Sequence, residues 1–217
     1  AAGGIDIQIL GIGRSGHIGF NEPGSSLSSR TRAVYLNDIT IRDAAADFEG
    51  IANVPPRALT MGISTILKAK KIILLAWGEK KADIVRQALE GAVTDKIPAT
   101  FLQYHQATTF HIDETAAGEL TRSCQPWLVN KIKWNDKLIR KAVLWLCTKV
   151  NKPILKIENK DYTDNGMSDL INLFGSANKV NIQVFNNLQH TISGWPGGKP
   201  DADDSTRPVK SKPFPKT

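Results

Sequence analysis

The sequence predicts an α/β fold in which a parallel sheet is flanked by helices. Two apolar runs, Ile5–Leu10 and Lys71–Trp77, have the pattern of buried strands. Helical segments of about ten residues alternate with such runs, which is typical of parallel sheets because each crossover needs a helix. Of the 217 residues, 41% are hydrophobic and 23% are charged, so the chain can form a packed core.

The segment between the two strands is expected to be loop followed by short helices. Residues 11–32 are rich in glycine and serine and predict a loop. A helix is expected at Thr40–Phe48, with Thr40 as its N-cap, because apolar residues recur there at helical spacing. A helical turn is expected at Ser64–Lys68.

A helix and a further strand are expected after Lys71–Trp77. The helix covers Lys80–Glu90, directs Ile84 and Ala88 to the core, and ends at Gly91. The strand is expected at Ala99–Leu102.

Three regions follow from this pattern: a first domain at 1–122, an α/β extension at 123–193 and a tail at 194–217. The extension is expected to contain a helix, a strand, a helix and a strand, at Asn135–Lys149, Pro153–Ile157, Ser168–Phe174 and Asn181–Phe185. The first of these helices has too broad an apolar face to stand alone, so we expect the extension to pack on the sheet. The tail holds five of the eleven prolines and is expected to be a linker.

The net charge of +7 comes mainly from lysines in the second half of the chain. These lysines lack the repeated aromatic and glycine pattern of an RNA-binding sheet, which favours a solvated surface over a nucleic-acid site. No apolar run reaches the roughly 18 residues that span a bilayer, so no membrane partner is expected. Cys124 and Cys147 form no CxxC pattern and predict buried thiols in a cytoplasmic protein. No residue pair has the spacing of zinc ligands, so no metal is expected.

A glycine pattern follows the first strand: Gly11–Gly16 reads GIGRSG and satisfies GxGxxG. In a dinucleotide site a helix begins inside the glycine run, and an acid follows about 20 residues later. Here Pro23 would disrupt such a helix, and no acid stands near position 30. We therefore expect no nicotinamide cofactor.

The same strip carries polar residues at the carboxyl end of a strand, where parallel sheets place their ligands. His17 can exchange protons near neutral pH, and a folded loop can bring the carboxylate of Glu22 onto its imidazole. The glycines, Gly11 and Gly13 among them, let the backbone approach a substrate closely. The alternative is a turn in which His17 and Glu22 only bond each other.

Several segments together resemble one enzyme family. LGIGRSGHIGFNEPGSSLSSRTR, then RALTMGISTIL, GEKKA, ALEG and FLQYH are similar, in the same order, to glucosamine-6-phosphate deaminases, also called isomerases. The resemblance covers about residues 3–122. The remainder resembles the extension of longer deaminase-like proteins, in which a stretch like Gln189–Pro200 precedes another domain.

The resemblance implies a Rossmann-like sheet and the conversion of glucosamine 6-phosphate and water to fructose 6-phosphate and ammonia. It implies that His17 opens the sugar ring as acid and base, that Glu22 polarises His17, and that Ser15 is the third member of the relay. Gly11, Gly13 and Lys81 would bind substrate, with Lys81 on the phosphate. The implied partner is therefore an amino sugar phosphate, and the chain is expected to be a homo-oligomer or part of a larger multidomain chain.

Some positions depart from the family pattern. Ser15 stands where many members carry an acid. Ala46 and Asp47 stand near the position at which the family has a phosphate-binding arginine, and neither can replace it. Ser25, Ser26 and Arg32 match residues of the family's allosteric pocket. Val34 replaces the lysine expected there, which argues against allostery by a hexose phosphate.

The family also implies sequence before the first strand, with a glycine- and serine-rich phosphate loop and a proton-transferring aspartate. Neither is found in these 217 residues. We therefore expect a sheet that is incomplete at its N-terminal side and a chain that cannot perform the whole reaction by itself. Two alternatives to an enzyme stay open: a sugar-phosphate sensor that has lost catalysis, and a basic nucleic-acid-binding module.

Overall fold

The computed structural model of the chain describes residues 3–193. The chain divides into two compact units, Ala1–Val129 and Asn130–Thr217. The boundary expected from the sequence, between Arg122 and Ser123, falls inside the short helix α4 (Thr121–Cys124). The expected linker at 194–217 lies outside the described residues.

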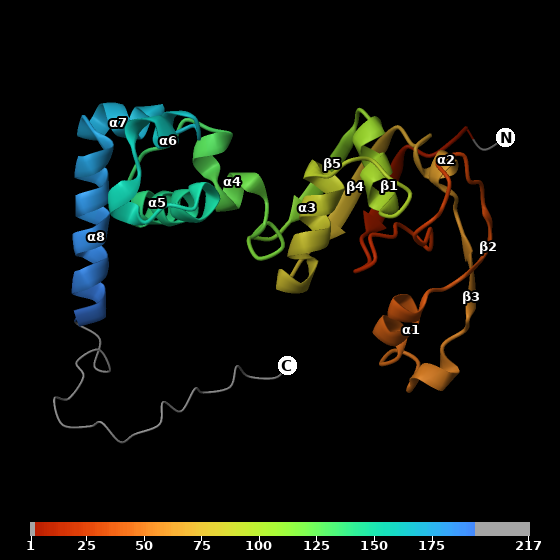
Figure 1. The fold of residues 1–217 in the computed structure, drawn as a ribbon. Coiled ribbons are helices and arrows are strands. Elements are labelled where there is room, and N and C mark those ends of the chain that lie inside the picture. Colours follow the sequence, from red (N-terminus) through yellow and green to blue (C-terminus); the bar gives the residue numbers. More distant parts are fainter. Residues whose placement is uncertain (1–2, 194–217) are drawn as a thin grey trace, which may run out of the picture. The chain divides into compact units, whose positions relative to one another are not determined.

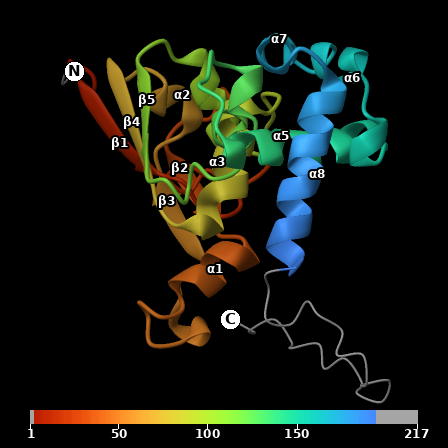
Figure 2. The ribbon, with the colours of Figure 1, turned by 90° about the vertical axis from the view of Figure 1, so that its left-hand side faces the viewer.

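The first unit contains the predicted parallel sheet. Its strands β1 (Ile7–Gly11), β4 (Lys71–Ala76) and β5 (Thr108–Ile112) lie side by side in the order β1-β4-β5 (Figure 2). Both pairings are parallel, with Ile7 opposite Lys71 and Ile72 opposite Thr108. The prediction of an α/β fold with a parallel sheet flanked by helices is confirmed.

The two faces of this sheet differ in burial. Alternate residues of a strand point to opposite faces, and Leu10, Ile72 and Leu74 share the buried face. On the other face Ile7 and Ile9 of the edge strand β1 are 57% and 61% exposed. The prediction of a buried strand at Ile5–Leu10 is therefore wrong for one of its two faces.

Two helices of the first unit contribute to the core against that buried face. They are α2 (Ile63–Ile66) and α3 (Ala82–Glu90). The predicted helix at Lys80–Glu90 is present, but its first residues form the separate 3₁₀ turn η2 (Glu79–Lys81).

The segment Ala99–Leu102 is not the predicted strand but part of the 3₁₀ helix η3 (Pro98–Tyr104), and the third strand of the sheet is β5. All four residues of the segment are buried, and a short apolar run does not distinguish a buried strand from a buried helix. Pro98 at the first helical position favours the helical start.

A second, antiparallel sheet, which was not predicted from the sequence, has two strands, β2 (Arg32–Tyr35) and β3 (Arg57–Thr60) (Figure 1). Between them lie helix α1 (Asp38–Ala44) and the 3₁₀ helix η1 (Ile51–Asn53). Asn37 at the N-cap of α1 accepts a hydrogen bond from the backbone of Thr40 over 2.8 Å. The cap is therefore Asn37 and not Thr40.

Over residues 130–193 the regular secondary structure of the second unit consists of helices. Four α-helices follow one another, coloured cyan to blue in Figure 1: α5 (Asp136–Val150), α6 (Asn159–Thr163), α7 (Ser168–Phe174) and α8 (Ala177–Ser193). The 3₁₀ turn η5 (Ile154–Lys156) connects the first two of them. The predicted strands Pro153–Ile157 and Asn181–Phe185 are wrong, and the extension is not α/β over these residues.

The helical state of Asn181–Phe185 has a packing reason. Ala177, Val180 and Val184 lie at helical spacing, and each is at most 3% exposed. Val184, which lies in the segment predicted as a strand, therefore belongs to a buried helical stripe instead, whereas Ile182 is exposed. The apolar face of α5 finds partners inside the same unit, since α5 contacts α6, α8 and η5.

Both cysteines, Cys124 and Cys147, are free thiols and are half-buried rather than buried. Within residues 3–193, no helix combines the length and the apolar character that crossing a membrane would need.

Candidate functional site

The candidate site lies in the loop that follows β1, at the carboxyl end of the parallel sheet. The loop is folded tightly, because the backbone N–H of Gly13 donates to His17 over 3.1 Å and that of Gly16 donates to Gly13 over 2.9 Å. Gly16 has φ of 79°, a left-handed conformation that glycine adopts readily.

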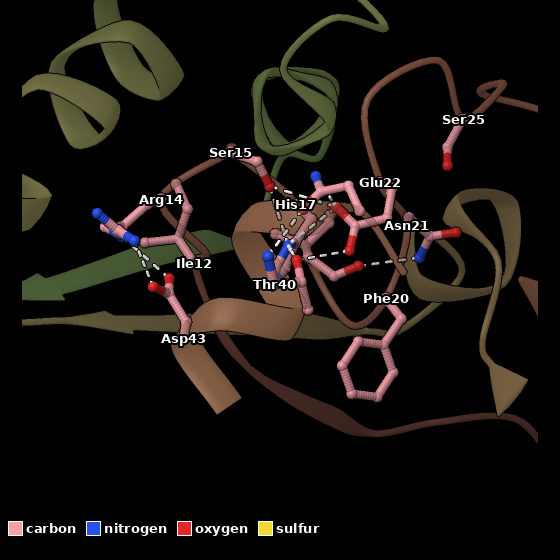
Figure 3. Close-up of polar contacts among 12 residues, drawn as sticks. Ile12, Arg14, Ser15, His17, Phe20, Asn21, Glu22, Ser25, Thr40 and Asp43 are labelled. Atoms are coloured by element: carbon pink, nitrogen blue, oxygen red, sulfur yellow. Dashed lines mark hydrogen bonds and ion pairs between the residues drawn. The ribbon is translucent and has the colours of Figure 1, made fainter. Parts of the chain in front are cut away.

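This loop brings Ser15, His17 and Glu22 into direct contact (Figure 3). Nδ1 of His17 lies 3.3 Å from Oε2 of Glu22, just beyond the roughly 2.6–3.2 Å of a catalytic hydrogen bond, which is often longer without substrate. The hydroxyl of Ser15 lies 3.0 Å from the same nitrogen and donates to Glu22 over 3.3 Å. The three residues assigned to catalysis from the sequence therefore form one hydrogen-bonded cluster.

Helix α1 supplies two further contacts to Glu22 that sequence reasoning missed. Thr40 donates to Oε1 and Asn37 donates to Oε2, each over 2.7 Å. Burial by itself raises the pKa of Glu22, but the hydrogen bonds from His17, Thr40 and Asn37 outweigh it and lower the pKa below its usual value. The carboxylate is therefore held in its charged form.

A local signal for these two residues was present in the sequence. Asn37 is a preferred N-cap residue, and a cap at this position places Thr40 in the first turn of the helix. With Asn37 as the cap, the hydroxyl of Thr40 becomes available to Glu22. It also lies 3.2 Å from Nδ1 of His17.

Gly13 makes room for the imidazole of His17. A Cβ atom at Gly13 would lie 2.2 Å from Cε1 and 2.3 Å from Nε2 of the ring, closer than real Cβ contacts. The ring therefore packs directly on the glycine backbone. A Cβ atom at Gly11 would meet no other atom within 4 Å.

His17 also lines an open cleft of about 420 Å³. The residues that line it come from β1 and the loop after it, helix α1, the segment just after that helix and the turn η2: Gly11, Ile12, Gly13, His17, Gly19, Thr40, Asp43, Ala44, Asp47 and Lys81. The cleft thus contains Gly11, Gly13 and Lys81, the three residues that the sequence assigned to substrate binding. It does not contain Ser15 or Glu22, which contact Nδ1 of the imidazole.

Lys81 is anchored at the wall of this cleft. Its Nζ donates to the backbone carbonyl of Ile12 over 2.8 Å. Burial lowers its pKa, and the positive charge of Arg14 lowers it further, whereas the negative charge of Asp43 raises it.

Arg14 and Asp43 form an ion pair between the loop and helix α1, which sequence reasoning missed (Figure 3). Nε of Arg14 donates to Oδ2 of Asp43 over 3.0 Å, and Nη2 donates to Oδ1. The hydrogen bond from Arg14 lowers the pKa of Asp43.

The residues suggested for an allosteric site lie in a different cavity, of about 340 Å³. Ser25, Ser26 and Arg32 line it together with Val34. Arg32 is already occupied, because it donates to Ser25 over 3.0 Å and to Asn21 over 2.9 Å. Glu22 lines this cavity too, so the His17–Glu22 pair lies between the two hollows.

Comparison with known proteins shows the family. Residues 1–111 match the family described as glucosamine-6-phosphate isomerases/6-phosphogluconolactonase. A glucosamine-6-phosphate deaminase-like protein of Bacteroides thetaiotaomicron is 56% identical over 214 residues, 99% of this chain and 32% of that protein. A glucosamine-6-phosphate deaminase of Rhodopirellula baltica is 53% identical over 121 residues, 56% of this chain and 48% of that protein.

A solved structure agrees. A monomeric glucosamine-6-phosphate deaminase has a TM-score of 0.52 and 53% identity to this chain, over 52% of this chain and 47% of that one. This chain spans 32–48% of the length of these relatives. By the match over residues 1–111, it belongs to the family of glucosamine-6-phosphate isomerases and 6-phosphogluconolactonases.

Proposed function

We propose that this chain carries the ring-opening part of a glucosamine-6-phosphate deaminase, which converts glucosamine 6-phosphate and water to fructose 6-phosphate and ammonia. The observation that carries the proposal is the contact of 3.3 Å between His17 and Glu22 beside a cleft that His17 and Lys81 line. Relatives more than 50% identical over this region are named glucosamine-6-phosphate deaminases.

In this proposal His17 moves the proton of the sugar ring. Glu22, fixed as a carboxylate by Thr40 and Asn37, accepts a hydrogen bond from Nδ1 and so keeps the opposite nitrogen available as an acceptor. Nε2 removes the proton of the anomeric hydroxyl and returns it to the ring oxygen as the carbon–oxygen bond breaks. The open-chain aldehyde results, without net loss of a proton.

Lys81 binds the phosphate group of the sugar in the same proposal. Its ammonium group has three N–H donors, one of which the carbonyl of Ile12 accepts. Gly11 and Gly13 line the same cleft and let the substrate approach the backbone.

The free thiols of Cys124 and Cys147 support a reducing compartment, and we place the protein in the cytoplasm.

One observation favours a second function, a sugar-phosphate sensor without turnover. The third member of the cluster is the hydroxyl of Ser15, which at neutral pH adds no negative charge beside His17. Glu22 is therefore the one carboxylate of this cluster that contacts the imidazole. The sensor would bind the same ligand in the same cleft and release no ammonia.

Ammonia release from glucosamine 6-phosphate tests the proposal. The assay uses the 217-residue chain and a chimera in which the chain is joined to the part of the Rhodopirellula baltica deaminase that it does not match. We expect activity in the chimera and little in the chain alone, because the general base and the phosphate loop were not found in these residues. His17→Ala should lower the rate of the chimera by about 10²–10⁴-fold, the usual contribution of a positioned acid and base.

The matched control is His111→Ala, since His111 is exposed on β5 and does not line the cleft. An unchanged rate in the His111 variant and a loss in the His17 variant support the enzyme. A chimera that binds the sugar phosphate but releases no ammonia supports the sensor. An active chimera in which His17→Ala has no effect contradicts the role assigned to His17.

A further inference from the structure

The charged side chains that line the cleft do not by themselves favour binding of a negatively charged phosphate. Lys81 adds one positive charge, whereas Asp43 and Asp47 add two negative ones. Two like charges 4 Å apart repel by about 4 kcal/mol near a protein surface, where the effective dielectric constant is about 20. A phosphate with a charge of about −2 therefore needs a further cation close to this cleft.

Arg14 is positioned to be that cation. It does not itself line the cleft, but it bonds Asp43, a residue of the cleft wall, through Nε and Nη2. This pairing neutralises one of the two carboxylates. The guanidinium carries five N–H donors, and in the part of the chain that the structure describes Asp43 accepts two of them. The remaining donors, on Nη1 and Nη2, form an edge that suits a phosphate.

Arg14 and Lys81 also belong to one local arrangement. Nζ of Lys81 is bonded to the carbonyl of Ile12, two residues before Arg14 in the same loop. Two residues of chain span at most about 7 Å, so both cations are anchored on one short segment. Their charges interact. Burial has the largest effect on the pKa of Lys81 and lowers it, Asp43 raises it, and the positive charge of Arg14 lowers it further.

We propose that Arg14 is a phosphate-binding residue of this cleft: Asp43 holds the guanidinium by one edge, and the other edge binds the phosphate of the sugar together with Lys81. The proposal rests on the proposed function, since it names the residue that selects a phosphorylated sugar at that site. Asp43 acts as a positioning residue, because it fixes a side chain that is itself half exposed.

Calorimetric titration of the 217-residue chain tests this assignment. The ligands are glucosamine 6-phosphate, inorganic phosphate and glucosamine, and the variants are Arg14→Gln and Arg14→Lys. We expect Arg14→Gln to weaken binding of both phosphates about tenfold to a hundredfold, the effect of losing a charge-assisted hydrogen bond. Binding of glucosamine should stay unchanged. Arg14→Lys should weaken phosphate binding less than Arg14→Gln does. Lysine keeps the positive charge but lacks the planar, bidentate N–H donors of the guanidinium.

Arg86→Gln is the matched control. Arg86 also pairs with a carboxylate, Asp83, over 2.8 Å, but Asp83, unlike Asp43, does not line the cleft. Equal affinity for both phosphates in the Arg14→Gln and Arg86→Gln proteins would overturn the assignment, and so would a wild-type chain that binds neither phosphate. Circular dichroism checks the fold, and if Arg14→Gln does not fold, the intermediate loss expected for Arg14→Lys decides.

The outcomes also separate this inference from the proposed function. If the chimera releases ammonia and Arg14→Gln binds phosphate as wild type does, the inference alone fails. If no ammonia is released and Arg14→Gln still weakens both phosphates, the deaminase proposal fails and the phosphate site stands.

Discussion

The hydroxyl of Thr40 donates a hydrogen bond to Oε1 of Glu22 over 2.7 Å and thereby connects helix α1 to the loop after β1. Both residues are at least nine-tenths buried. The candidate relay is therefore supported from a helix, which holds the carboxylate more rigidly than a loop could by itself.

Replacement of Thr40 by valine tests this support. Thr40→Val keeps the shape but leaves Oε1 of Glu22 without this donor, so the free energy of unfolding should fall by about 1–3 kcal/mol. Urea unfolding of the wild type and the variant measures the change. Thr109→Val is the control, because Thr109 is exposed on β5. A loss of equal size in both variants would contradict a specific role for Thr40.

The stability of the chain should depend on pH through Glu22. Its pKa is lowered in the folded state, so the folded state binds the proton less well than the unfolded state does. The stabilisation is complete above the pKa of the unfolded chain, about 4.3, and is lost as the pH falls through the lower folded value.

Glu22→Gln removes this contribution. In urea unfolding between neutral pH and about pH 3, the difference in stability between wild type and Glu22→Gln should shrink with acidification. Glu114→Gln, at an exposed glutamate, gives the reference profile. A difference that stays constant over this range would show that the charge of Glu22 does not stabilise the fold.

Gly13→Ala should displace the imidazole of His17 without unfolding the chain. The new methyl group would meet the ring 2.2–2.6 Å away, and a side-chain ring can move where backbone cannot. The NMR signals of His17 should therefore shift, and ammonia release by the chimera should fall as it does for His17→Ala. Gly11→Ala, which meets open space, should leave the His17 signals in place. Unshifted His17 signals in Gly13→Ala would contradict the packing described.

The second unit has its own buried hydrogen bond to test. Tyr162 is fully buried and donates to Oδ1 of Asn181 over 2.7 Å, while Asn181 donates to Ile157 over 2.8 Å. Tyr162→Phe should cost about 1–3 kcal/mol because it leaves a buried acceptor without its donor. Tyr104→Phe, at a tyrosine that is 61% exposed, should change little in the same unfolding experiment. Equal effects would show that this bond does not stabilise the unit.

Much of the first unit could be predicted from local patterns. The apolar run at Lys71–Trp77 and the helix at Lys80–Glu90 follow from periodicity, which the sequence contains directly. The antiparallel strands β2 and β3 escaped prediction because they are short and carry no hairpin signal, since α1 and η1 lie between them.

Short apolar segments were the places where periodicity failed. Ala99–Leu102 and Asn181–Phe185 fit a strand as well as a helix, and burial in the assembled unit selected the helix. In the second unit Val180 and Val184 are both buried and lie one helical turn apart in α8. Their burial on one face of that helix favours the helix over the strand.

The sequence by itself determined that a glycine loop after a strand would present His17, Glu22 and Ser15 together, since all three lie within eight residues. Only the tertiary structure decided what surrounds them. Thr40 is 18 residues from Glu22, and Asp43 is 29 residues from Arg14. Periodicity and motifs report on neighbours along the chain, whereas these contacts depend on where α1 lies against the loop, which the packing of the folded chain sets.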